Sequence, residues 1–166
     1  SSTMPPANYY DDESGFDFGG IALDNNGTIS KCEANGSIIL SRYYSGQNVM
    51  IGTFSVVNNG EISHCRSNVD YTIVGHQSAW WYVISGIGGD PWSEGTIENC
   101  LNTGDIDANI VNESSEPHAQ IVSIAGIGTY NITNCANTGD ITLDYSSILI
   151  NSADAATRVG FIYPYE

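Results

Sequence analysis

Basic residues are scarce in this 166-residue sequence. Only four Lys and Arg stand against 19 Asp and Glu, and the formal net charge is −15. Because phosphate contacts need clustered Lys and Arg, nucleic acids and anionic membrane surfaces are not expected as partners. Acidity of this degree keeps a protein solvated, and it is compatible with divalent cations or a saline exterior as surroundings.

Long apolar runs and helical patterns are missing as well. No stretch of 18 or more apolar residues occurs, so no segment is expected to insert into a bilayer. The start SSTMPPANYYDDESG lacks the blocks of a signal peptide, and we expect a mature product or an excised fragment. No segment combines a sustained helical period with caps, and Gly and Asn recur too often for long helices. These absences predict one all-β domain.

Four cysteines mark an internal repeat. They are 33, 35 and 35 residues apart, within the aligned sequences GTISKCEANGSI, GEISHCRSNVDY, GTIENCLNTGDI and YNITNCANTGDI. The cysteines are Cys32, Cys65, Cys100 and Cys135. Three residues before them stand Ile29, Ile62, Ile97 and Ile132. Six residues after them stand Ile38, Tyr71, Ile106 and Ile141, and eight residues after them Leu40, Ile73, Ala108 and Leu143. This period of two predicts an amphipathic strand after each Cys.

Each repeat closes with a third apolar run, seen in VMIGTFSVV, WWYVISGIGG and IVSIAGIG. Three short strands and three turns in about 34 residues describe one coil of a solenoid. We therefore predict a right-handed parallel β-helix of about four three-strand coils, with Cys and Ile ladders stacked about 4.8 Å apart. Gly36, Gly104 and Gly139 share a turn column, where positive φ is expected.

The β-helix is expected to occupy residues 20–166 as a single domain. Residues 1–19 match no repeat, and a cap, an arm and a disordered segment are all open for them. The tail RVGFIYPYE resembles the opening of a fifth coil. An uncapped coil exposes unpaired backbone groups, so a cap or a neighbouring chain is expected to cover it.

The segments GGIALDNNGTISKC at 19–32 and GIGGDPWSEGTIENC at 86–100 resemble the GLUG repeat of bacterial surface proteins. That family includes adhesins and the repeat regions of some immunoglobulin A peptidases. The resemblance covers roughly residues 19–145, and its most specific pieces are GTIENCLNTGDI and NITNCANTGDI. It implies a β-helical stalk or adhesive region and carries over no catalytic residues. Val69 departs from the pattern, because it stands where the turn glycine is expected.

The cysteine column favours a buried, reduced ladder of small apolar side chains. Disulfides between Cys32 and Cys65 and between Cys100 and Cys135 are the alternative, for which the parallel side chains must rotate toward each other. Zinc is not expected, because its ligands converge tetrahedrally, whereas these cysteines form a line and no Cys-x-x-Cys pair occurs.

Asp70, Asp105 and Asp140 stand five residues after their cysteines, so stacking places three carboxylates in one column about 5 Å apart. Two interpretations are open. One is a calcium ion between two coils, assisted by the turn carbonyls of Gly104 or Gly139. The other is a solvated outward face. Calcium is the only cofactor that the sequence suggests.

Aromatic residues suggest a ligand-binding strip. Trp80, Trp81 and Tyr82 are consecutive, so at least one of the two tryptophans should face outward from a strand. Tyr43 and Tyr44 occupy the comparable stretch one coil earlier. Such a strip can stack on sugar rings or receive a protein, although packing against the adjacent long loops is the alternative.

No nucleophile can be paired with any of the three histidines by spacing, so we do not expect an enzyme. The leading expectation is a secreted or cell-surface, adhesin-like stalk that binds a host or cell-surface glycan or protein. A structural subunit that self-associates end to end into an extracellular filament is the first alternative. A polysaccharide hydrolase or lyase that uses the Asp column is a minor alternative.

Overall fold

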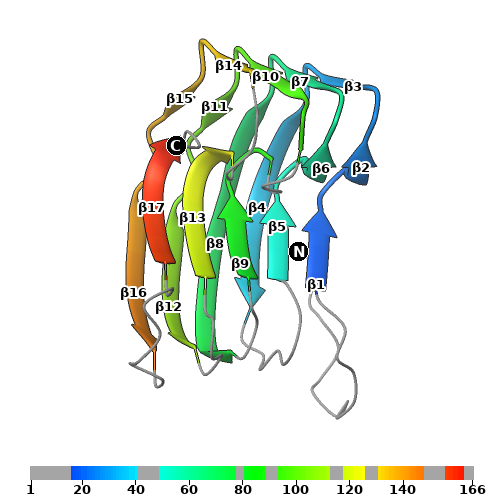
Figure 1. Ribbon diagram of the computed structural model, residues 1–166. Helices are drawn as coiled ribbons and strands as arrows, with labels where there is room; N and C mark the ends of the chain where they lie inside the picture. Colours follow the sequence, from blue (N-terminus) through cyan, green and yellow to red (C-terminus); the bar gives the residue numbers. More distant parts are fainter. Residues whose placement is uncertain are drawn as a thin grey trace.

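The computed structural model describes residues 16–40, 49–77, 81–88, 93–112, 118–125, 131–147 and 156–162. Within these ranges the chain is all-β, as predicted, and every strand pairing is parallel. No helix in this part of the chain is long and apolar enough to cross a membrane. Strands that pair are about one repeat apart in the sequence, so each repeat adds one strand, or two consecutive strands, to each main sheet (Figure 1).

The first sheet contains the third apolar run of each repeat. Its order is β1 (Phe16–Gly19), β5 (Val49–Gly52), β9 (Trp81–Ser85), β13 (His118–Ala125) and β17 (Ala156–Ile162). The strand β1 lies within residues 1–19, which the sequence analysis sets apart, yet it pairs with β5. The strand β1 contains no residue of the cysteine motif, so a comparison of the repeats did not reveal it. The strand β17 includes part of the tail RVGFIYPYE.

The second sheet contains the isoleucine that precedes each cysteine by three residues. Its short strands are β3 (Thr28–Ser30), β7 (Glu61–Ser63), β10 (Thr96–Glu98) and β14 (Asn131–Thr133). Their central residues Ile29, Ile62, Ile97 and Ile132 are partners in one continuous register. The first three are buried, because successive residues of a strand point to opposite faces and the middle residue here faces inward.

The third sheet follows the cysteines. It consists of β4 (Glu33–Leu40), β8 (Arg66–Gln77), β11 (Leu101–Asn102), β12 (Ile106–Asn112), β15 (Ala136–Asn137) and β16 (Ile141–Ser147). The two predicted columns are confirmed, because Tyr71 pairs with Ile38 and Ile106, and Ile73 pairs with Leu40 and Ala108. A small sheet of β2 (Ala22–Asn25) and β6 (Ser55–Asn58) completes the described strands.

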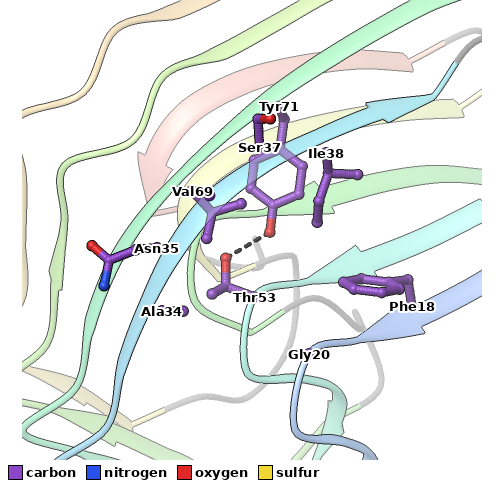
Figure 2. A pocket seen from close by; sticks show the side chains of 10 residues that line it. Phe18, Gly20, Ala34, Asn35, Ser37, Ile38, Thr53, Val69 and Tyr71 are labelled. Carbon is purple, nitrogen blue, oxygen red and sulfur yellow. Dashed lines mark hydrogen bonds between the residues drawn. The ribbon is translucent and has the colours of Figure 1, made fainter. Parts of the chain in front are cut away.

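A polar contact inside the molecule joins Thr53, which directly follows β5, to the third sheet. The Oγ1 atom of Thr53 lies 2.6 Å from the hydroxyl oxygen of Tyr71 (Figure 2). The same atom lies 3.1 Å from Oγ of Ser67. All three residues are buried. The contact satisfies hydroxyl groups that would otherwise be desolvated without a partner.

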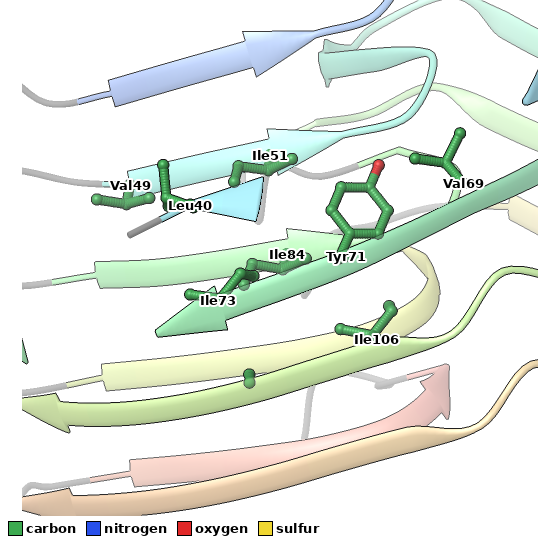
Figure 3. Packing of buried hydrophobic residues seen from close by; sticks show 9 residues of the cluster. Leu40, Val49, Ile51, Val69, Tyr71, Ile73, Ile84 and Ile106 are labelled. Atoms are coloured by element: carbon green, nitrogen blue, oxygen red, sulfur yellow. The ribbon is translucent and has the colours of Figure 1, made fainter. Parts of the chain in front are cut away.

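The interior between the first and third sheets is filled by stacked aliphatic side chains (Figure 3). Ile51 and Ile84 enter it from the first sheet, and Tyr71, Ile73 and Ile106 from the third. Each of these five side chains is no more than 1% exposed. Full burial of one such side chain contributes about 1.5–3 kcal/mol, so the columns supply much of the folding free energy.

Left-handed backbone conformations occur at a column that the sequence analysis did not single out. Lys31, His64, Asn99 and Asn134 have φ between 51° and 55°, and each directly precedes a cysteine. These residues turn the chain from the second sheet into the third. In the glycine column, where positive φ was expected, only Gly36 has it, with φ of 146°. The prediction of a shared left-handed glycine turn was therefore wrong for Gly104 and Gly139.

Close approach of successive repeats explains Gly104 and Gly139 instead. A Cβ atom on Gly104 would lie 2.1 Å from the carbonyl oxygen of Val69, and one on Gly139 would lie 2.1 Å from that of Gly104. The backbones of neighbouring repeats are in contact at this turn. A shift of either backbone would break the pairing register between the two repeats.

We predict that Gly104→Ala lowers the free energy of unfolding by about 1–3 kcal/mol, because the added methyl group clashes with backbone rather than with a flexible side chain. Gly27→Ala is the matched control, since a Cβ atom there meets nothing within 4 Å. Urea unfolding followed by far-ultraviolet circular dichroism measures both. Equal stability of the two variants would contradict the backbone contact between coils.

Candidate functional site

Four thiols form a continuous row at the inner corner between the second and third sheets. This cysteine row consists of Cys32, Cys65, Cys100 and Cys135, all of them free. The two central residues are each 2% exposed, and the two outer residues are half-buried. The central thiols belong to the core cluster that includes Ile62 and Ile97, and the outer thiols pack against it.

Three of the four thiols approach a carbonyl oxygen of the preceding repeat. Sγ of Cys65 lies 3.6 Å from the carbonyl oxygen of Ile29 and 3.2 Å from that of Ser63. Cys100 and Cys135 repeat this arrangement, at 3.6 Å from the carbonyl oxygens of Ile62 and Ile97 respectively. Each of these three side chains therefore lies close to the backbone of the preceding repeat as well as to that of its own.

Neighbouring thiols in the row influence one another's protonation. The hydrogen bond with Cys100 lowers the pKa of Cys65 and, at the end of the row, the pKa of Cys135, with burial opposing in both. The same hydrogen bonds, to Cys135 and Cys65, raise the pKa of Cys100, and burial adds to this. Burial, followed by the charge of Cys65, raises the pKa of Cys32. Of the two half-buried end thiols, Cys135 therefore accommodates negative charge better than Cys32.

The structure brings the three predicted aspartates together in one exposed column. The backbone N–H of Asp105 donates to Oδ1 of Asp70 at 3.0 Å, and that of Asp140 donates to Oδ1 of Asp105 at 2.8 Å. Ser37 occupies the same position in the first coil, paired with Asp70. The carboxylates therefore accept turn N–H groups from the next coil, which satisfies donors at the start of each third-sheet strand.

Calcium at this column remains a prediction. In the ranges that the structure describes, no group of three or more His, Cys, Asp or Glu side chains is placed to hold a metal ion. The turn carbonyls expected to assist already have donors, because Nδ2 of Asn102 donates to Gly104 O at 2.9 Å and Nδ2 of Asn137 donates to Gly139 O at 2.7 Å.

Asparagine ladders are the polar feature that the sequence analysis missed. Nδ2 of Asn102 also donates to Oδ1 of Asn137 at 2.8 Å. On the other side of the molecule, Nδ2 of Asn25 donates to Oδ1 of Asn58 at 2.7 Å, and both residues are buried. The signal was present in the sequence, since Asn25 and Asn58 each stand four residues before the isoleucine of the second sheet.

Most of the predicted aromatic strip falls outside the described residues. Tyr43, Tyr44 and Trp80 lie there, as do the side chains of Trp81 and Tyr82. The backbone of the last two belongs to β9, where Trp81 pairs with His118 and Tyr82 pairs with Val49 and Ala119. The strip therefore stays a prediction, and of its five residues only Trp81 and Tyr82 have a described backbone position, in the first sheet.

A hollow of about 170 Å³ opens beside the first coil (Figure 2). It arises because Ala34 and Gly36 in the first coil stand over the larger Ser67 and Val69 of the second. Phe18 and Ile38 form its apolar walls, and the Thr53–Tyr71 contact forms its floor. Burial raises the pKa of Tyr71, so the phenol stays neutral and adds no charge to the hollow.

Comparison with known proteins assigns no relative to this chain. No protein-family model, curated protein or solved structure gives a significant match. The GLUG resemblance therefore rests on the motif residues of the repeats, and the function has to be argued from the geometry of the chain.

We predict that Asp105→Ala lowers the free energy of unfolding by about 1 kcal/mol, because the N–H of Asp140 loses its acceptor. Asp105→Asn keeps an acceptor oxygen and should cost less. The same variants test calcium: if the column binds it, calcium raises the thermal midpoint of the wild type and has less effect on Asp105→Asn. An unchanged wild-type midpoint in millimolar calcium would contradict the metal site.

Proposed function

We propose that the repeats form a right-handed parallel β-helix of about four three-strand coils, and that this solenoid is an adhesin-like stalk or binding module of a secreted or cell-surface protein. The observation that carries the proposal is the common register of three sheets across successive repeats. A crossover between parallel strands of one sheet is almost always right-handed, which supports the proposed hand.

Hydrogen bonds recur at the same position of every coil and support a rigid stalk. The N–H groups of Arg66, Leu101 and Ala136 donate to the carbonyl oxygens of Cys32, Cys65 and Cys100 respectively, each at 2.9 Å. In a solenoid each coil contacts only its neighbours, so identical junctions transmit the same geometry along the axis. Such an array displays its loops at fixed spacing, as an adhesive surface requires.

The engagement of the aspartates favours a binding module over a polysaccharide hydrolase. A hydrolase opposes two carboxylates across the sugar bond, about 5–9.5 Å apart. Here Asp70 and Asp105 lie on the same flank, and each accepts a backbone N–H of the next coil. The acidic composition and the motif resemblance to GLUG repeats support a secreted or cell-surface location.

We predict that the aromatic strip binds a host or cell-surface glycan. Of Trp80→Ala and Trp81→Ala, the variant at the outward-facing position should weaken binding at least about tenfold, since one stacked aromatic ring contributes over 1 kcal/mol. A glycan array followed by calorimetry on the best ligand measures this. The control is Val74→Ala, at an exposed position of the third sheet. Equal affinity of all three variants would contradict the strip as the binding site.

End-to-end assembly into a filament is a second candidate, which strand pairing favours. The outermost strands of the second sheet, β3 and β14, each have one neighbour in the described part of the chain, and they carry the same isoleucine column. Four coils spaced about 4.8 Å apart rise only about 20 Å, so a stalk requires further coils stacked on these. A second copy would continue the isoleucine column of the second sheet, and in the first sheet its β1 would take the place beside β13 that β17 holds in the single chain.

Negative-stain electron microscopy over a concentration series, with and without calcium, tests the assembly. If copies stack, we expect filaments whose axial repeat is about 20 Å per chain, the rise of four coils. Isolated particles at every concentration would contradict stacking and leave the glycan-binding module as the remaining proposal. Absence of a strand signal in the circular dichroism of the purified chain would contradict both the stacking and the glycan-binding module.

A further inference from the structure

The cysteine row is an ordered set of free thiols that neither adhesion nor stacking requires. Small apolar residues would fill the same corner, yet four cysteines stand there in one column. We propose that the row is a site of reversible oxidation, at which a small-molecule disulfide links Cys32 to Cys65 and Cys100 to Cys135, fastening the coils in pairs.

Register restricts which thiols can meet. The residues on both sides of the cysteines are paired in sequence order, as Ser30 is with Ser63 and Glu33 with Arg66. Neighbouring strands are about 4.8 Å apart, within the range of Cα separations that disulfides accept. Cysteines two coils apart are separated by about 10 Å, beyond the limit of about 7 Å. Only neighbours in the row can bond.

This restriction selects one pairing. Four cysteines allow three connectivities. One would join Cys32 to Cys100, and another would join Cys32 to Cys135, so both include a bond between distant coils. Complete oxidation of the folded chain can therefore give only Cys32–Cys65 together with Cys100–Cys135.

The exposure of the thiols selects the same pairing and sets the order in which the two disulfides form. The oxidant first meets the half-buried end thiols, and the buried neighbours Cys65 and Cys100 complete the bonds from inside. The hydrogen bond with Cys100 lowers the pKa of Cys135, while burial and the charge of Glu98 raise it. Burial and Cys65 raise the pKa of Cys32. Because thiolates are the reacting species, the Cys135 end should react first.

The chemistry is an ordinary thiol–disulfide exchange. With oxidised glutathione, the thiolate of Cys135 attacks one sulfur of the oxidant, forms a mixed disulfide and releases one glutathione thiolate. Cys100 then loses its proton, and its sulfur attacks Sγ of Cys135 and releases the second glutathione. Two protein thiols are oxidised, and one glutathione disulfide is reduced to two thiols. An oxidising exterior, which rests on the location proposed above, supplies such an oxidant.

Reversibility follows from the direction of the side chains. Thiols on parallel strands in register point the same way, and they must rotate toward each other to bond. The Sγ atoms of Cys65, Cys100 and Cys135 already approach the backbone of the preceding coil at 3.6 Å, so part of the displacement toward the neighbouring cysteine is present in the reduced chain. The remaining strain makes the bond easier to reduce than a relaxed disulfide.

The test is peptide mapping of the full folded chain after incubation with oxidised glutathione and alkylation of the remaining thiols. Trypsin cuts at Arg42 and separates Cys32 from Cys65, and a protease that cuts before Asp105 separates Cys100 from Cys135. We expect both bonds, with Cys100–Cys135 forming faster. A Cys65–Cys100 bond would overturn the proposal, and so would glutathione that stays on the end thiols without any internal bond.

Matched variants separate this proposal from the β-helix itself. Cys32→Ser should leave Cys65 reduced and Cys100–Cys135 intact, and Cys135→Ser should do the reverse. Oxidation in concentrated urea should give mixed connectivities. A bond between distant coils in the folded protein would contradict the row and the solenoid together. Absence of any bond in a chain that keeps its strand signal would overturn the oxidation site alone.

Discussion

Parallel stacking in register is the constraint on which the rest of this structure depends. It places each residue directly over the equivalent residue of the previous repeat, about 4.8 Å away. A residue type must therefore be compatible with itself as a neighbour. Isoleucine meets this condition through dispersion contacts and burial, and it forms the continuous column from Ile29 to Ile132.

A polar side chain meets the same condition only when it can both donate to and accept from the same side chain in the neighbouring repeat. Otherwise the backbone has to supply the missing donor or acceptor. Asparagine does the first, as the buried Asn25–Asn58 amide contact demonstrates. A carboxylate can only accept, and Asp105 bonds the backbone N–H of Asp140 rather than its carboxylate. Exposure of the aspartate column to solvent reduces the remaining repulsion. A chain with net charge −15 can therefore stack its acidic residues on its outer face.

Columns of one residue type were predictable from the sequence, and columns held by backbone geometry were not. Cysteine and isoleucine repeat unchanged, so their alignment was evident, and the aspartate column followed from it. The left-handed turn is occupied by Lys31, His64 and two asparagines, and no shared side-chain property signals it. The sequence analysis singled out Gly104 correctly but explained it by a positive φ. The residue is instead required because a Cβ atom there would clash with the backbone of Val69. The strand β1 lacks the motif and could be recognised only by pairing with β5.

The same constraint indicates where functional variation can arise. A residue inside a column is determined largely by its neighbours, so changes are tolerated mainly where a column is interrupted. The first coil has several such interruptions: Ala34 and Gly36 open the hollow over Ser67 and Val69, and Ser37 ends the aspartate column. The exposed Ile39 of the same coil stands over Thr72 on the outer face. Stacking alone accounts for the residues of the central repeats, but it does not account for these residues of the first repeat. In a protein whose interior is set by repetition, recognition is therefore expected at the interrupted columns and in the loops between strands, and stability in the columns that continue.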